Sequence, residues 1–82
     1  MDQLFPERAR QYVRQVFWTG KVHSHDDMGD QITEVFIDGR TRRGPWAIMT
    51  PASHVAYGVG LGLGKGQRFE RQADGRFLKT EG

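Results

Sequence analysis

Five side chains in this sequence could hold a metal ion or transfer a proton. His23 and His25 share one polar stretch with Asp26 and Asp27, and His54 lies further along the chain. Imidazole nitrogens and carboxylate oxygens are common zinc ligands. The spacing His23-x-His25, however, is not a structural-zinc signature, and the same residues are typical of an exposed polar loop. Because the chain also has no cysteine, thiolate coordination is excluded.

The sequence offers few residues for catalysis. Ser53 and His54 are neighbours in the chain, so their side chains need not face each other as a nucleophile and its base must. Asp26 and Asp27 are adjacent in a polar loop, not paired in an apolar setting that would separate their pKa values. We therefore expect a protein that is not an enzyme. A hydrolase or nuclease that uses the histidine and aspartate loop is the alternative.

Residues 58–66, Gly-Val-Gly-Leu-Gly-Leu-Gly-Lys-Gly, form the most unusual stretch of the chain. A phosphate-binding P-loop needs Ser or Thr after its lysine, but Gly66 follows Lys65. The glycine spacing also differs from the dinucleotide-binding pattern, so nucleotide hydrolysis is not expected. Two interpretations remain. The run is either a flexible connector, which is the commoner use of glycine, or an extended segment whose amides contact phosphate or another backbone.

The charge of the chain is bipolar. Residues 1–39 carry four basic and seven acidic groups, a net charge of −3, whereas residues 40–82 carry eight basic and three acidic groups, a net charge of +5. A basic pole attracts phosphates or acidic protein surfaces, and the planar guanidinium of arginine suits bidentate contacts to either. The residues that we expect to bind the partner are Arg40, Arg42, Arg43, Lys65, Arg68, Arg71 and Arg76. Scattered solvated charge is the simpler alternative.

Aromatic residues alternate with some of these cations. If the segment around Phe69 is a regular strand, Phe69 and Arg71 share one face, as do Phe77 and Lys79. Arginine and aromatic side chains on one face suit single-stranded nucleic acid. Because only 37% of the chain is hydrophobic, we expect both phenylalanines, and Trp46 with them, to lie in the core instead, with the arginines around its rim.

The 82 residues predict one small domain. A chain of this size buries only about 60% of its unfolded surface, so a homodimer or a docked partner could add stability. No apolar run is long enough to cross a membrane, and the N-terminus lacks the pattern of a signal peptide. We therefore expect a cytoplasmic protein with no membrane partner.

Periodicity and turn signals predict an α+β fold, in which an N-terminal helix packs on a small antiparallel sheet of two β-hairpins. Pro6 suits the start of the first helix, Asp38-Gly39 is a tight-turn signal, and Thr50-Pro51 suits the start of a second helix. The expected elements are a helix over 6–18, a hairpin over 32–49, a short helix over 51–57, a glycine-rich loop over 58–66 and a hairpin over 67–80.

Residues 35–39, 44–49, 58–62 and 64–79 together resemble a group of small uncharacterised proteins encoded by bacteriophages, prophages and plasmids. The group is similar to zinc ribbons, with two Cys-x-x-Cys pairs. The positions of those cysteines match His25, Met28, Thr50 and Ser53 of this chain, and only the histidine after the second pair is retained, as His54. The resemblance implies a degenerate, metal-free zinc-ribbon-like scaffold of mobile-element origin.

Together these patterns favour a non-enzymatic binding protein that contacts nucleic acid or a host nucleic-acid-handling complex. A counter-defence inhibitor, such as an anti-CRISPR protein, is one concrete version. The alternative is a divergent zinc-ribbon-like domain that binds metal through His25 and His54 with a nearby carboxylate. No cofactor is expected in the first case.

Overall fold

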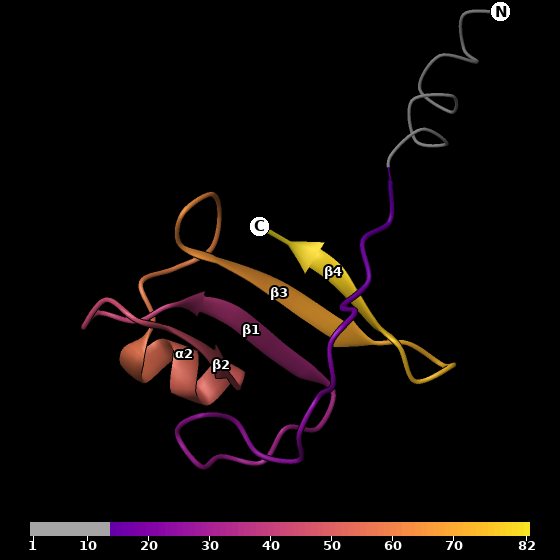
Figure 1. The fold of residues 1–82 in the computed structure, drawn as a ribbon, viewed down its shortest axis with the longest axis horizontal. Coiled ribbons are helices and arrows are strands. Elements are labelled where there is room, and N and C mark those ends of the chain that lie inside the picture. The colour runs from indigo at the N-terminus through magenta and orange to yellow at the C-terminus, as the bar shows by residue number, and fades with distance from the viewer. Residues whose placement is uncertain (1–13) are drawn as a thin grey trace, which may run out of the picture.

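The computed structural model describes residues 14–82, which form one open antiparallel sheet and one short helix (Figure 1). Strands β1 (Val35–Arg40), β2 (Trp46–Met49), β3 (Gly66–Arg71) and β4 (Phe77–Glu81) are arranged in the order β2-β1-β3-β4. Helix α2 (Pro51–Tyr57) follows β2 and packs against β1 and β2. The expected α+β class with two hairpins is confirmed.

An aromatic cluster forms the core on one face of the sheet. Phe36 of β1 lies directly opposite Phe69 of β3, and their rings stack with centroids 5.2 Å apart. Trp18 packs edge-on against both rings, at 5.2 and 5.3 Å. Phe77 completes the buried cluster together with Ile32. Phe69 and Phe77 are therefore core residues, as expected in a chain with so few apolar side chains.

Helix α2 begins and ends where its local sequence predicts. The Thr50 side chain accepts a hydrogen bond from Ser53 N–H at 3.1 Å, which satisfies an otherwise unpaired donor of the first turn. Pro51 occupies the first helical position, where it needs no donor. The Gly58 N–H closes the last turn on His54 O at 2.8 Å. The expected helix over 51–57 is confirmed.

The predicted helix over 6–18 is wrong for residues 14–18, and its first part, residues 6–13, lies outside the described residues. Residues 16–18 are extended along the outer edge of β4. Lys79 N–H donates to Val16 O at 2.7 Å, and Trp18 N–H donates to Phe77 O at 2.9 Å. The helical spacing of the apolar residues was a local signal, and the burial of Trp18 over the phenylalanine cluster outweighs it.

The tight turn predicted at Asp38-Gly39 is also wrong, because β1 continues through Arg40. A side chain at Gly39 would place its Cβ 2.9 Å from Lys65 O and 3.2 Å from Gly66 Cα. Glycine is needed here for the close approach of β1 and β3, not for a turn. The chain instead reverses over residues 41–44, where Thr41 N–H and Oγ1 both donate to Pro45 O. Arg42 and Arg43 therefore lie in a turn rather than in a return strand.

Both outer strands of the sheet have partners along part of their edges. On β2, Ile48 N–H donates to Asp27 Oδ2 at 2.7 Å, and Ile48 O accepts from Asp27 N–H at 3.0 Å. On β4, residues 16–18 form backbone hydrogen bonds with Phe77 and Lys79 along the outer edge. Covered edges disfavour the addition of a strand from another chain. The turns and loops at the two ends of the sheet are therefore the surfaces to consider for binding.

Candidate nucleic-acid interface

The structure does not bring the seven expected basic residues together. Because Gly39 pairs with Gly66 at one end of the sheet and Val35 with Glu70 at the other, the residues divide by position along β1 and β3. The loop-end group consists of Arg40, Arg42, Arg43 and Lys65; the turn-end group consists of Arg71 and Arg76; Arg68 lies between them on β3. The expected single rim of arginines is therefore not what the fold produces.

The turn-end group is engaged within the protein. Arg76 donates to Asp74 with its backbone N–H at 3.0 Å and with its Nε at 2.8 Å, and these two hydrogen bonds lower the pKa of Asp74. The Arg76 guanidinium also lies 4.0 Å from the centre of the Phe17 ring. Arg71 donates twice to Thr33 O and lies 4.7 Å from the centre of the Phe77 ring. Both guanidiniums thus hold the β3–β4 turn and the chain around it in place.

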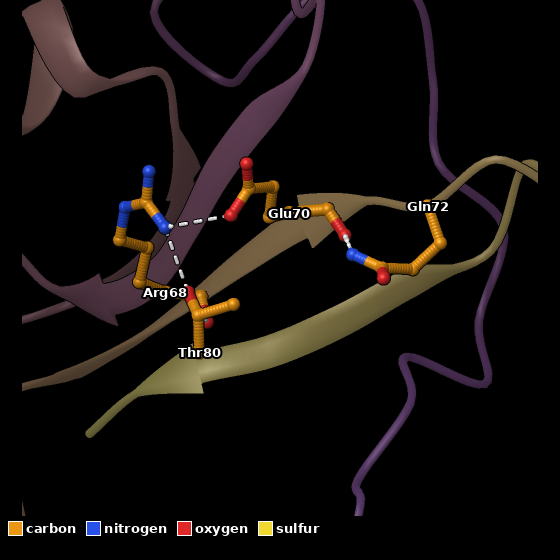
Figure 2. A network of polar contacts seen from close by, with 4 residues as sticks. All are labelled: Arg68, Glu70, Gln72 and Thr80. Carbon is orange, nitrogen blue, oxygen red and sulfur yellow. Dashed lines mark hydrogen bonds and ion pairs between the residues drawn. The ribbon is translucent and has the colours of Figure 1, made fainter.

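Arg68 and Glu70 flank Phe69 on β3, so their side chains lie on the sheet face opposite the phenylalanine cluster. There they belong to a small polar network (Figure 2). It donates to Thr80 Oγ1 of β4 at 2.7 Å and to Glu70 Oε1 at 3.5 Å. Gln72 Nε2 donates to Glu70 O at 3.0 Å. Because Glu70 offsets the positive charge, this face gives little attraction for an anion.

In the loop-end group, Arg42 joins the β1–β2 turn to the last turn of α2. Its backbone N–H donates to Tyr57 O at 2.8 Å, and its side chain donates to Ala56 O at 3.1 Å. A cation at a helix C-terminus satisfies carbonyls that have no partner within the helix and lies at the negative end of the helix dipole. Within residues 14–82 these contacts use carbonyl oxygens and no carboxylate, so no carboxylate in this part of the chain neutralises Arg42.

Arg40 connects β1 to the glycine-rich loop. Its backbone N–H donates to Lys65 O at 2.8 Å and its Nε to Gly64 O at 3.2 Å. Within residues 14–82, the side chains of Arg43 and Lys65 make no hydrogen bond and no ion pair, and both are exposed. Arg43 and Lys65, two of the four cations at this end, can therefore bind a partner without losing a contact within residues 14–82.

The glycine-rich loop is closed by hydrogen bonds, and so differs from the flexible connector that its glycine content favours. Gly62 N–H donates to Gly66 O at 2.8 Å, Lys65 N–H donates to Gly62 O at 2.9 Å, and His54 Nε2 lies 3.0 Å from Gly60 O. Positive φ angles at Gly62 and Gly64, 115° and 74°, allow this closed path. Glycine serves here to shape a hydrogen-bonded loop that α2 and β1 hold in place.

Exposed apolar side chains surround the same end of the sheet. Trp46, which lies opposite Arg40 in the β1–β2 pairing, is 50% exposed, and Tyr57 at the end of α2 is 51% exposed. Leu63 in the loop is fully exposed. Sequence reasoning placed Trp46 in the core and missed this surface. A groove of about 560 Å³ adjoins it, lined by Met28, Thr41, Arg42, Arg43, Ala56 and Tyr57.

The charge around this end is predominantly positive. Residues 39–69, which include the β1–β2 turn, α2 and the loop, contain no Asp or Glu. The preceding carboxylate, Asp38, is partly buried, and burial raises its pKa. Glu81 of β4 lies opposite Arg68, and the next residue, Gly82, approaches Gly66 at the base of the glycine-rich loop, so this carboxylate lies near the loop but away from β2 and α2. The absence of carboxylates over this long stretch is the sequence signal that could have identified the surface.

The residues considered as metal ligands have other roles. Asp26, only 6% exposed, accepts from Met28 N–H at 2.9 Å, from Asp30 N–H at 2.8 Å and from Thr50 N–H at 2.8 Å. Burial acts to raise the pKa of Asp26, but hydrogen bonds from Thr50, Ser53, Asp30 and Met28 outweigh it and lower the pKa overall. Asp26 therefore fastens the loop over residues 24–31 to the start of α2.

His25 and His54 do not form a ligand pair with a carboxylate. His25 Nδ1 lies 2.9 Å from Ser24 Oγ, and His54 points toward Gly60 O of the glycine-rich loop. In the part of the chain that the structure describes, no three histidine, aspartate or glutamate side chains are grouped so as to hold a metal ion. The geometry gives the alternative zinc site no support.

Comparisons of the chain with protein-family models, with curated proteins and with solved structures found no match. Among residues 14–82, the structure has no helix with the length and apolar character that a membrane span requires. The role of the candidate site is therefore inferred from its own residues and their geometry.

Proposed function

We propose that this protein binds nucleic acid, alone or within a host nucleoprotein complex, and that it does so through one end of its sheet without catalysing a reaction. The loop-end surface, as we call it, consists of Arg40, Arg42, Arg43, Trp46, Tyr57, Leu63 and Lys65. The observation that carries the proposal is the gathering of four cations and three exposed apolar side chains in a segment without a carboxylate.

These residue types match the two main sources of nucleic-acid affinity. Lysine and arginine neutralise phosphates and release condensed counterions, which gives strong and salt-dependent binding. Exposed Trp and Tyr rings offer stacking surfaces for bases, and arginine stacks in the same way. Arg42, held by α2, and Arg40, held against the loop, are already oriented, so little side-chain freedom is lost when a phosphate binds.

The biological setting forms the second part of the proposal. The resemblance to proteins of phages and plasmids supports a mobile-element origin and a degenerate zinc-ribbon-like scaffold. A small binding protein from such an element could act by occupying the nucleic-acid channel of a host defence complex, as an anti-CRISPR-type inhibitor does. A pull-down from host lysate, with and without nuclease treatment, distinguishes direct nucleic-acid binding from a protein contact.

Charge reversal tests the proposed surface. Arg43→Glu and Lys65→Glu change exposed side chains that have no partner in residues 14–82, so both variants should fold normally. Binding to labelled single-stranded and duplex DNA and RNA, followed by fluorescence anisotropy, should weaken at least tenfold in the double variant. Arg76→Gln, at the opposite end of the sheet, is the control; its melting temperature checks its folding, and it should bind normally. Equal loss in all variants, or no loss in any, would contradict the proposed surface.

A further inference from the structure

The glycine-rich loop carries an apolar side chain that the fold does not use. Leu63 is fully exposed, more than any other large hydrophobic residue in the described chain. An exposed leucine is ordinary on its own. Here, however, Leu63 lies in a loop that is fixed by hydrogen bonds and flanked by cations. We therefore ask what kind of partner could receive its side chain.

The loop is slender around Leu63. Its neighbours Gly62 and Gly64 have no side chains, and a Cβ added at either position would meet no atom within 4 Å. The leucine therefore projects from bare backbone, with open space on both sides. A loop of this kind can approach a narrow groove closely, and the minor groove of B-DNA is only about 6 Å wide.

The loop is also held in one conformation before any partner binds. Gly66 N–H and Lys65 N–H both donate to Gly62 O, at 3.0 and 2.9 Å, and Arg40 Nε donates to Gly64 O at 3.2 Å. A preorganised loop loses less conformational entropy on binding than a flexible one. The backbone that carries Leu63 is thus held in place by Arg40 of β1 and by the hydrogen bonds of the loop itself.

Charge identifies the kind of partner. Arg40 and Lys65 lie at the base of the loop, and Arg42 and Arg43 lie in the adjoining turn, with no carboxylate between residues 39 and 69. A partner that receives Leu63 is therefore favoured if it brings negative charge close to these four cations. Duplex DNA does so, because phosphates line both walls of the minor groove.

We propose that Leu63 is a wedge that enters the minor groove of duplex DNA and partly unstacks one base step, while the surrounding cations hold the two phosphate backbones. Proteins that insert apolar side chains in this way kink the duplex. Pyrimidine–purine steps such as TA unstack most readily and are the preferred target. The inference rests on the proposed function and specifies its ligand.

The experiment measures unstacking and binding separately. A duplex of 20 base pairs carries 2-aminopurine at a central TA step, whose fluorescence rises when the base unstacks, and a second copy carries end labels for energy transfer. The full chain should raise the 2-aminopurine signal at least twofold and shorten the end-to-end distance. Leu63→Ala should abolish both signals while the salt dependence of binding stays the same. Leu63→Phe, which keeps a large apolar wedge, should restore both.

The control is Val55→Ala, which truncates another exposed apolar side chain on α2 and should leave both signals intact. Melting temperatures should not change in any of these variants. Duplex binding that depends on Arg43 and Lys65 without unstacking overturns the wedge and leaves the proposed function standing. Absence of binding to any nucleic acid overturns both. Leu63-dependent binding to vesicles of anionic phospholipid, without unstacking of DNA, would also overturn the wedge.

Discussion

Thr50 N–H donates to Asp26 Oδ2 at 2.8 Å. This bond joins the loop over residues 24–31 to Thr50, the residue just before α2. Thr50 Oγ1 donates in turn to Asp30 Oδ2 at 2.5 Å. The loop over residues 24–31 and the start of α2 therefore meet in space, and the buried Asp26 carboxylate connects them. We therefore expect the Asp26 carboxylate to contribute strongly to stability.

Asp26→Asn should destabilise the protein by about 2–3 kcal/mol, because three backbone N–H groups lose a charged acceptor and the amide of asparagine adds donors where only acceptors fit. Urea denaturation followed by tryptophan fluorescence measures the change. Asp27→Asn is a useful comparison, because Asp27 is exposed and its side chain accepts only one N–H. A loss for Asp26→Asn no larger than that for Asp27→Asn would contradict the role of Asp26.

Asp26 also predicts how stability depends on pH. Its pKa in the folded protein lies below the ordinary value of 3.8, so its contribution is fully present above that value and is lost as the pH falls through the folded pKa. The free energy of unfolding of the wild type should therefore decrease below about pH 4. In Asp26→Asn this decrease should be clearly smaller. Parallel curves for the two proteins would show that another carboxylate causes the acid sensitivity.

Asp38 predicts the opposite effect. Burial raises its pKa above 3.8, so the charged carboxylate disfavours the folded state, and stability falls as the pH rises from the unfolded to the folded pKa. Asp38→Asn should therefore stabilise the protein at pH 7 and make little difference at pH 3. Denaturation at both pH values measures this. A variant that is less stable at pH 7 would reveal a favourable interaction of the carboxylate.

The proposed zinc-ribbon-like scaffold can be tested by restoring thiolates. Replacing His25, Met28, Thr50 and Ser53 with cysteine should create a site that binds one zinc ion, because Asp26 already holds the two segments together. Titration with cobalt, which gives a characteristic absorption when bound by four thiolates, and elemental analysis provide the measurement. A variant that keeps Ser53 should bind much more weakly. Absence of stoichiometric metal in the four-cysteine protein would contradict the resemblance.

Local signals predicted only part of this fold. Helix α2 was predictable because its determinants, Thr50 and Pro51, lie within its own sequence. The Asp38-Gly39 signal failed because Gly39 is required by its close approach to Lys65 and Gly66, which are distant in the sequence. Residues 16–18 were misassigned for the same reason, since their partners lie in β4. Long-range pairing can override local propensity and cannot be derived from one short segment.

The candidate site was predictable in its composition but not in its arrangement. The sequence identified the basic residues, but alternation along a strand could not show that Arg71 and Arg76 are engaged by Thr33 and Asp74. It also placed Trp46 in the core, because a large aromatic residue next to a strand is usually buried. Only the register of β1 and β2, which places Trp46 opposite Arg40, locates it at the loop end.

The salt dependence of nucleic-acid binding tests the central claim most directly. For the wild type, the logarithm of the binding constant should fall steeply and linearly with the logarithm of the salt concentration. In Arg43→Gln/Lys65→Gln, which removes two charges without reversing them, the slope should decrease in magnitude by about 1.8 for duplex DNA, since each lost phosphate contact accounts for about 0.9. The control Arg76→Gln should retain the wild-type slope. An unchanged slope in the double variant would show that the loop-end surface does not contact the phosphates.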